Sequence, residues 1–283
     1  FRSVEVLKGS SQIAYGPQTL GGVVNYLTPA PPSAPSASLS ITGGSESYFN
    51  AHASAGGRIG ATGLLVDYVR KQGDGARENT SSRVDDLSLK AVAPVGESQT
   101  LTFKAAWYHE DSNLTYSGLR QAEWEANPRQ NPFENDRTDF RNLSASVVHD
   151  LVLSPNARLS TAAYGSLFSR DWWRQSSNSS QRPNDASDPA CGGMANLSTT
   201  CGNEGRLRDY TTWGVTPRLT LDHVVLGSRS QLHAGVRWHQ EKQERVQTNG
   251  PLPTSRDGVV VEENRRDAKA FSAFVDNRFE WGR

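Results

Sequence analysis

The sequence predicts an all-β fold in which a long antiparallel sheet forms part of a transmembrane β-barrel, and three observations lead to this prediction. Polar and apolar residues alternate along most of the chain, which is the pattern of strands with two chemically different faces. The connections between these strands alternate between short turns and long loops, as in outer-membrane barrels. No stretch of eighteen apolar residues occurs, so we expect no transmembrane helix, whereas barrel strands are compatible with a polar average composition.

Ten segments show the alternation of β-strands. In one of the clearest, Leu101 and Trp107 fall on one face while Thr102 and Lys104 fall on the other. A strand with one apolar and one polar face fits either a soluble sandwich or a membrane barrel, so alternation alone does not separate the two architectures. In chain order, the predicted strands cover residues 37–43, 47–57, 60–71, 83–93, 98–110, 139–152, 157–171, 207–222, 228–241 and 267–280.

The lengths of the connections favour the barrel. Every second connection is a tight turn, and the others are long, so all turns would lie on one rim and all loops on the other. A sandwich rarely keeps such regularity over many hairpins, and long loops are usually functional. The short connections are residues 58–60, 95–97, 155–157 and 226–228, and the long ones are residues 72–83, 111–139, 171–208 and 241–267.

The charge balance excludes one class of partner. The chain has 283 residues, with 30 Lys and Arg against 30 Asp and Glu. A protein that binds the phosphate backbone of nucleic acid needs a basic surplus, so we expect no nucleic-acid partner. The chain begins at Phe1 without a leader and stops at Arg283 directly after a strand-like run, so we interpret it as a fragment of a longer protein.

Two cysteines, Cys191 and Cys201, lie close together in a segment rich in Gly, Asn and Ser. Such a pair predicts an exposed disulfide in an oxidising compartment, which would stabilise its loop by about 2–3 kcal/mol. The alternative is a pair of reduced thiols with no structural role.

The first 28 residues differ from the rest of the chain. Gly16 and Pro17 form a turn signal, and Gly21 and Gly22 permit close backbone approach before a short apolar strand. A stretch rich in Pro, Ala and Ser follows at residues 29–36 and has the composition of a linker. We therefore expect the first 28 residues to belong to a different domain from the strands.

The opening stretch VEVLKGSSQIAYGPQTLGGVVNYLT resembles the last part of the plug domain of TonB-dependent outer-membrane receptors. The remainder resembles the ferric citrate receptor group within that family, in SSRVDDLSLKA, in SGLRQAEWEANPRQNPFENDRTDFRNLSASV and in RDYTTWGVTPRLT. The resemblance implies that residues 1–28 are the end of a plug, that residues 29–36 are a linker, and that residues 37–283 are the first part of a 22-stranded barrel.

The resemblance also implies a function. The expected protein is a receptor in the outer membrane of a Gram-negative bacterium that takes up a ferric siderophore, with ferric citrate or a related carboxylate chelate as the expected cargo. No chemistry on the cargo is implied, so we do not expect an enzyme, and iron is expected only as part of the chelate, without a resident cofactor. The expected partners are the outer-membrane lipid and the inner-membrane TonB complex, reached through the missing N-terminal part.

A citrate-type chelate is anionic. Guanidinium groups stay charged at any physiological pH and form bidentate hydrogen bonds with carboxylates. The resemblance points to Arg170, to Arg208 and to either Arg265 or Arg266 as ligand-binding residues at the bases of loops. Arg170 has the parity of Tyr164 and Arg208 has the parity of Thr212, and this parity directs both arginines into the lumen of the barrel. The alternative is that these arginines are exposed and pair with Asp or Glu.

Other polar and aromatic residues give weaker signals. The tryptophans are candidates either for stacking on a ligand or for anchoring at the membrane interface. The histidines lack the spacing of metal ligands, so we predict no metal site. The carboxylates lack a nucleophile and an orienting partner, so we interpret them as solvated charges. The residues concerned are Trp124, Trp172 and Trp173; His52, His109, His149, His223, His233 and His239; and Asp85, Asp86, Glu123, Glu125, Glu262 and Glu263.

Two other functions stay open on the sequence. The same fold could carry a different nutrient, such as a cobalamin or an oligosaccharide. A different architecture, a secreted β-sandwich that binds or cleaves carbohydrate with its loop carboxylates, predicts a soluble monomer.

Overall fold

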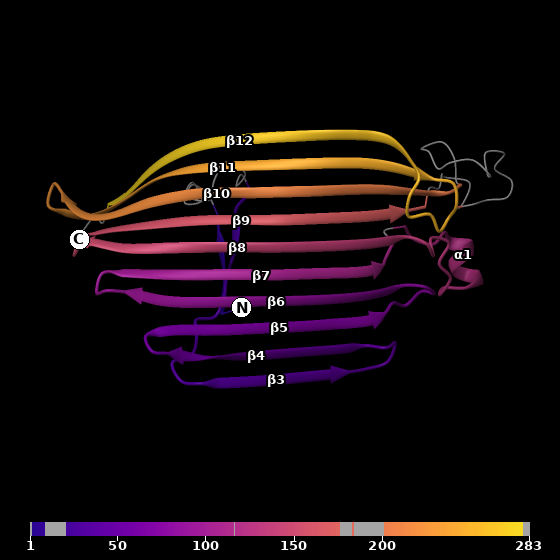
Figure 1. Cartoon of the computed structure of the whole chain (residues 1–283), viewed down its shortest axis with the longest axis horizontal. Helices are drawn as coiled ribbons and strands as arrows, with labels where there is room; N and C mark the ends of the chain where they lie inside the picture. The colour runs from indigo at the N-terminus through magenta and orange to yellow at the C-terminus, as the bar shows by residue number, and fades with distance from the viewer. Residues whose placement is uncertain (1, 9–20, 116, 176–182, 184–200, 280–283) are drawn as a thin grey trace.

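The computed structural model describes residues 2–8, 21–115, 117–175, 183 and 201–279, and it contains two antiparallel sheets. A small sheet pairs β1 (Ser3–Leu7) with β2 (Val23–Leu27). In the large sheet, ten strands pair strictly in chain order and lie side by side, with tight turns at one end and loops at the other (Figure 1). These strands are β3 (Ser36–Gly43), β4 (Phe49–Ile59), β5 (Thr62–Asp74), β6 (Ser81–Val95), β7 (Gln99–Asn113), β8 (Arg137–Ser154), β9 (Ala157–Arg174), β10 (Asn203–Val225), β11 (Ser228–Gly250) and β12 (Val259–Phe279).

The all-β prediction and the ten strands of the large sheet are confirmed. The described residues form one sheet of ten strands and one of two, rather than two large sheets packed face to face, so the sandwich alternative is wrong. One short helix, α1 (Gln121–Ala126), which was not predicted, lies in the β7–β8 connection. Among the described residues, no helix has the length and apolar character needed to cross a membrane.

The strands are longer than predicted at the loop end. Three of the long connections shrink to residues 75–80, 114–136 and 251–258, β9 extends to Arg174 and β10 begins at Asn203, and residues 259–266, predicted as loop, belong to β12. The reason is that the hydrogen-bonded ladders continue through segments that do not alternate: residues 241–245 are polar on both faces, whereas Val259 to Val261 are apolar on both. Alternation in hydropathy marks only the part of a strand with one polar and one apolar face, so these extensions leave no such signal.

The tight turns have a local cause. Gly60, between β4 and β5, and Gly96, between β6 and β7, have φ values of 59° and 63°. A residue with a side chain adopts this left-handed region only at a cost that glycine does not have, which is why glycine is favoured in the two-residue turn at Gly60 and in the three-residue turn at residues 96–98.

The two faces of the large sheet differ in chemistry. One face exposes a continuous band of large apolar side chains, since the register places Trp107 opposite Leu143 and Val215 opposite Trp238. We call this the outer face. The opposite face carries Lys90 of β6, which donates hydrogen bonds to the backbone that follows β2, and the small sheet crosses behind the large one on that side (Figure 1). We call this the lumenal face.

Candidate ligand site on the lumenal face

Three arginines form a row across the lumenal face near the loop end. Arg170 of β9 is the direct cross-strand partner of Arg208 of β10, and Arg208 is the direct partner of Arg245 of β11. Side chains that face each other in this way have Cβ atoms about 5 Å apart, and like charges so placed repel. A row of three cations on neighbouring strands is therefore an unfavourable arrangement unless an anion lies over it.

The protein itself neutralises only part of this row. Arg245 donates from Nη2 to Oε2 of Glu262 at 3.0 Å. Within the described ranges, Arg170 and Arg208 form no ion pair with a carboxylate, and the buried Nε of each has no hydrogen-bond partner. The row therefore keeps two guanidinium charges and unsatisfied N–H donors that point to a partner outside the chain.

The indole ring of Trp172 contacts three guanidinium groups, one from the row and two from residues nearer the loop end. The Cζ atoms of Arg170, Arg174 and Arg206 lie 5.2, 5.4 and 5.8 Å from the ring centroid of Trp172, which is cation–π distance. Glu204, which is fully buried, pairs with Arg174 and Arg206. Together with the row, five arginines thus lie on this part of the face, and Glu204 pairs with two of them.

Aromatic rings lie directly below the arginine row. The ring centroids of Phe140 and Phe168 are 6.3 Å apart, and those of Phe168 and Tyr210 are 5.8 Å apart. Gln243 donates to the hydroxyl of Tyr210 at 2.7 Å and fixes the ring. An open depression of about 620 Å³ extends from these rings, and its lining includes Asp86, Tyr108, Phe168, Tyr210 and Glu241. The candidate site therefore has a cationic rim and an aromatic base.

The structure separates the predicted arginines. Arg170 and Arg208 lie side by side, and Arg266 lies opposite Gln243, on the same lumenal face. Arg265 lies on the outer face opposite Glu244 and forms ion pairs with Glu244 at 3.9 Å and Asp267 at 3.6 Å. Of the two residues that sequence reasoning left open, only Arg266 is on the side of the site.

Sequence reasoning missed Arg174, Arg206 and Arg245. Arg245 has the same parity as Arg237, which lies on the polar face of its strand, but the predicted strand ended at residue 241. Continuing the same alternation for four residues beyond the predicted end of the strand would have placed Arg245 on the lumenal face. Arg174 was hidden by the same early end of the predicted strand.

The remaining predicted residues lie in different surroundings. Trp124 is an exposed residue of α1, whereas Trp173 is buried beneath the guanidinium of Arg256, which lies 5.9 Å from its ring. The description of Asp85 as a solvated charge is wrong: this buried carboxylate accepts hydrogen bonds from Tyr68 at 2.6 Å and from Arg70 at 3.0 Å. Both partners are on the adjacent strand, which a single-strand pattern does not reveal.

The loops above the site are joined to one another. Asp136 accepts a hydrogen bond from the backbone N–H of Gln175 at 2.7 Å, and Arg256 donates to the carbonyl of Asn135 at 3.0 Å. Burial raises the pKa of Asp136 to about 6, and burial also lowers the pKa of Arg256. Residues that follow β7, β9 and β11 thus meet above the sheet.

The cysteine and metal predictions fall partly outside the described part of the chain. Cys201 is disulfide-bonded, but it is buried, so the prediction of exposure is wrong for this cysteine; Cys191 lies outside the described residues. In the described part, no group of three or more His, Cys, Asp or Glu side chains is arranged to hold a metal ion.

Comparison with solved structures identifies the fold. The chain superimposes on the ferric citrate transporter FecA, in its unliganded form, with a TM-score of 0.82 and 20% sequence identity over 99% of this chain. It superimposes on the ferric-catecholate import receptor Fiu from E. coli K12 with a TM-score of 0.74 and 13% identity over 99% of this chain. For BauA, the ferric preacinetobactin receptor from Acinetobacter baumannii, the values are 0.71 and 16%, again over 99%.

These matches cover less than half of the larger proteins. The chain spans 40% of FecA, 47% of Fiu and 44% of BauA. No family model matches the chain. The described structure therefore has the fold of a segment of TonB-dependent siderophore receptors, as the resemblance in the sequence predicted, and the ten-stranded sheet corresponds to part of their barrel.

Proposed function

We propose that this chain is a segment of a TonB-dependent receptor in the outer membrane of a Gram-negative bacterium, and that the whole protein imports a ferric chelate. The exposed apolar band of the outer face supports insertion in a lipid bilayer, because such a band is costly in water. The likeness to receptors named for ferric chelates supports the cargo class.

One observation carries the choice of an anionic, carboxylate-rich chelate: Arg170 and Arg208 face each other without a counter-charge from the described residues. Guanidinium groups recognise carboxylates with two parallel hydrogen bonds, and the unused Nε donors suit that geometry. The chelates named for the similar structures differ in chemistry, so the fold does not select among them. The arginine row supports ferric citrate or a related carboxylate siderophore.

The proposed mechanism involves binding and conformational change rather than catalysis. The chelate binds over the arginine row, and the loops joined at Asp136 and Arg256 then close above it. Closure follows binding because the closed conformation binds the chelate more tightly than the open one does, and the difference in affinity sets how far the equilibrium shifts. The plug then rearranges under force from the inner-membrane TonB complex, which would act on a part of the protein outside this chain. The iron enters and leaves as part of the chelate, and the protein needs no resident metal or cofactor.

The test uses the full-length receptor in detergent and an R170A/R208A double variant, with calorimetric binding of ferric citrate as the readout. Each charged hydrogen-bond site is worth about 1.5–3 kcal/mol, so we expect affinity to fall by about 100-fold or more. The matched control is R158A, because Arg158 shares the strand and the face of Arg170 but lies near the turn end. It should bind as the unmodified protein does.

Two outcomes would contradict the proposal. Unchanged binding of ferric citrate by the double variant would remove the arginine row from ligand recognition. Absence of ferric-chelate binding in the unmodified receptor, together with binding of a cobalamin or a neutral oligosaccharide, would favour a receptor for another nutrient.

A further inference from the structure

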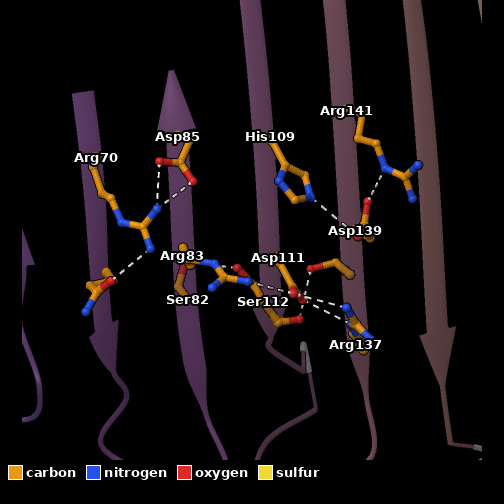
Figure 2. Close-up of polar contacts among 12 residues, drawn as sticks. Arg70, Ser82, Arg83, Asp85, His109, Asp111, Ser112, Arg137, Asp139 and Arg141 are labelled. Carbon is orange, nitrogen blue, oxygen red and sulfur yellow. Dashed lines mark hydrogen bonds and ion pairs between the residues drawn. The ribbon is translucent and has the colours of Figure 1, made fainter. Parts of the chain in front are cut away.

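A second arginine cluster lies on the opposite side of the sheet, on the outer face. Its members are Arg70 of β5, Arg83 of β6, and Arg137 and Arg141 of β8, and Figure 2 shows them beside three aspartates on β6, β7 and β8. We call these four residues the outer arginine band. None of them belongs to the proposed ligand site.

The register fixes the height of this band relative to the apolar band. On β7, His109 and Asp111 follow Trp107 by two and four residues on the same face. Cross-strand pairing then places Asp85 and Arg141 beside His109, and Arg83 beside Asp111. The arginine band thus begins where the exposed apolar side chains end.

Each arginine of the band is held by an aspartate. Arg70 contacts both carboxylate oxygens of Asp85, at 3.0 and 3.2 Å. Arg137 makes two parallel hydrogen bonds to Asp111, both at 3.0 Å, and Arg83 contacts the same carboxylate at 3.4 Å.

The third aspartate holds the last arginine. Arg141 donates to Asp139 at 2.7 Å, and His109 approaches the other oxygen of Asp139 at 3.5 Å. A second guanidinium nitrogen of Arg141 lies 3.8 Å from Asp171 of β9, where the band ends. The guanidinium groups are therefore positioned by carboxylates and do not need a further ligand to be ordered.

These ion pairs are layered, with the carboxylates beneath and the guanidinium groups above. The side chain of Arg141 is 58% exposed against 18% for Asp139, and that of Arg83 is 49% exposed against 24% for Asp111. Arg70 and Asp85 show the same order, at 34% and 11%. The band therefore presents guanidinium groups outward, although Asp85, Asp111, Asp139 and Asp171 balance their charge. Arg83 and Arg141 keep N–H donors that these carboxylates do not use.

The height of the band matches the headgroup layer of a bilayer. A strand tilted by about 45° rises about 2.3 Å per residue along the membrane normal, so His109 and Asp111 lie about 5 and 9 Å above Trp107. The headgroup region on each side of the hydrocarbon core is about 5–8 Å thick, so Arg141, beside His109, lies within it and Arg83, beside Asp111, lies at its outer edge. Phosphate groups are the anions at this level, and guanidinium pairs with them as it does with carboxylate.

We propose that the outer arginine band is a binding surface for the phosphate groups of a lipid headgroup, with Arg83 and Arg141 as the phosphate contacts. This inference rests on the proposed function only in assuming that the sheet spans a membrane, and it concerns a face that does not contact the chelate. The aspartates beneath set the position of the guanidinium groups, and the lipid phosphate takes the outward donors.

The test uses the full-length receptor, purified in detergent and analysed by native mass spectrometry with two probes. The probes are diphosphorylated lipid A and the same lipid with both phosphates removed, so the acyl chains are identical. We expect the unmodified receptor to retain about 10-fold more of the phosphorylated probe than of the dephosphorylated one. In an R83Q/R141Q double variant, this ratio should fall at least fivefold. The matched control is R265Q, because Arg265 is also an exposed outer-face arginine paired with carboxylates, on β12.

Heat-modified electrophoretic mobility verifies that each variant is folded, and ferric citrate binding is measured on the same samples. The inference is overturned if the unmodified receptor shows no preference for the phosphorylated probe, if the double variant keeps the preference, or if R265Q loses as much. In each of these cases, ferric citrate binding by the unmodified receptor would show that the proposed function is unaffected. Loss of chelate binding in the unmodified receptor would instead contradict the proposed function.

Discussion

Lys90 and Pro29 are joined by a hydrogen bond of 2.7 Å from the ammonium group to the carbonyl oxygen. The same ammonium donates to the hydroxyl of Thr28 at 3.1 Å and to its carbonyl at 3.4 Å. One side chain of β6 thus holds the segment that follows the small sheet. Further along this segment, Pro31 and Pro32 lie against Gly63 and Gly56 of the large sheet, so polar and apolar contacts together fix it on the lumenal face.

Replacement of Lys90 by Met should release this segment while preserving the length of the side chain. Three oxygens lose their donor, and each net hydrogen bond is worth about 0.5–1.5 kcal/mol, so cleavage within residues 28–35 by a protease of broad specificity should accelerate about 10-fold. The measurement is limited proteolysis of the folded receptor. The control is K104M, because Lys104 is the direct cross-strand partner of Lys90 and lies on the same face. Equal cleavage of both variants would show that removal of any lumenal lysine has this effect.

Replacement of Gly63 by Ala should displace the same segment by steric contact. A Cβ atom at this position would lie 2.9 Å from Cβ and 3.3 Å from Cγ of Pro31, which requires the proline to move. Overpacking of this kind costs about 1–3 kcal/mol, so proteolysis of the segment should accelerate as it does for the Lys90 variant. At Gly165 the nearest atom to an added Cβ is 3.6 Å away, so G165A should leave cleavage unchanged. If G63A also leaves it unchanged, the proline does not occupy this position in solution.

Particular residues show how far the sequence predicts this structure. The apolar face of β7 was predicted correctly because Leu101, Phe103 and Trp107 repeat at every second position. The upper part of β11, including Arg245, was not, since its pairing depends on the strands on both sides of it. The helix α1 has six residues and is stabilised by a hydrogen bond from the backbone of Arg120 to the side chain of Glu123, too little for a helical period to be recognised.

The candidate site was predictable in part for the same reason. Parity within one strand directed Arg170 and Arg208 to the lumenal face. Their direct opposition, the convergence of Arg170, Arg174 and Arg206 on Trp172, and the absence of a counter-charge for Arg170 and Arg208 among the described residues are consequences of cross-strand register. Register is set by turns and by the pairing of whole strands, so it does not follow from the residues of either strand alone.

The Asp136 carboxyl should make the loop contact to Gln175 dependent on pH. Its pKa is about 6 in the folded protein, above the ordinary value of 3.8, because burial outweighs the effects of Arg174 and Arg256. The folded loop therefore binds the proton more tightly than the opened loop does. The loop should be most stable below about pH 4, lose stability as pH rises through about 6, and stay at the lower value above that. The difference of about two pH units corresponds to about 3 kcal/mol.

Hydrogen exchange over residues 127–138, corrected for intrinsic rates, measures this effect at pH 5 and pH 7.5. The variant D136N keeps an oxygen for the Gln175 N–H and carries no charge, so it should open about 10–100-fold less often than the unmodified protein at pH 7.5 and show little change with pH. The control is E134Q, because Glu134 is an exposed carboxylate two residues away. Protection in the unmodified loop that rises from pH 5 to pH 7.5 would contradict the assignment.

Replacement of Glu262 by Gln should strengthen the binding of an anionic chelate. Glu262 supplies the counter-charge for Arg245, at 3.0 Å, and also accepts a hydrogen bond from Asn264 at 2.8 Å, which the amide oxygen of the E262Q side chain would still accept. Because the pair is partly exposed, its loss should cost less than about 1 kcal/mol of stability, so the variant should fold. All three guanidinium groups of the row would then be available, and we expect ferric citrate to bind about 3–10-fold more tightly at low salt, with a steeper dependence on ionic strength.

The matched control is E263Q, because Glu263 is the adjacent, exposed residue on the outer face and its removal changes the net charge equally. Tighter binding by both variants would mean that net charge rather than the arginine row attracts the chelate, and weaker binding by E262Q would mean that Glu262 positions Arg245 for the ligand instead of competing with it.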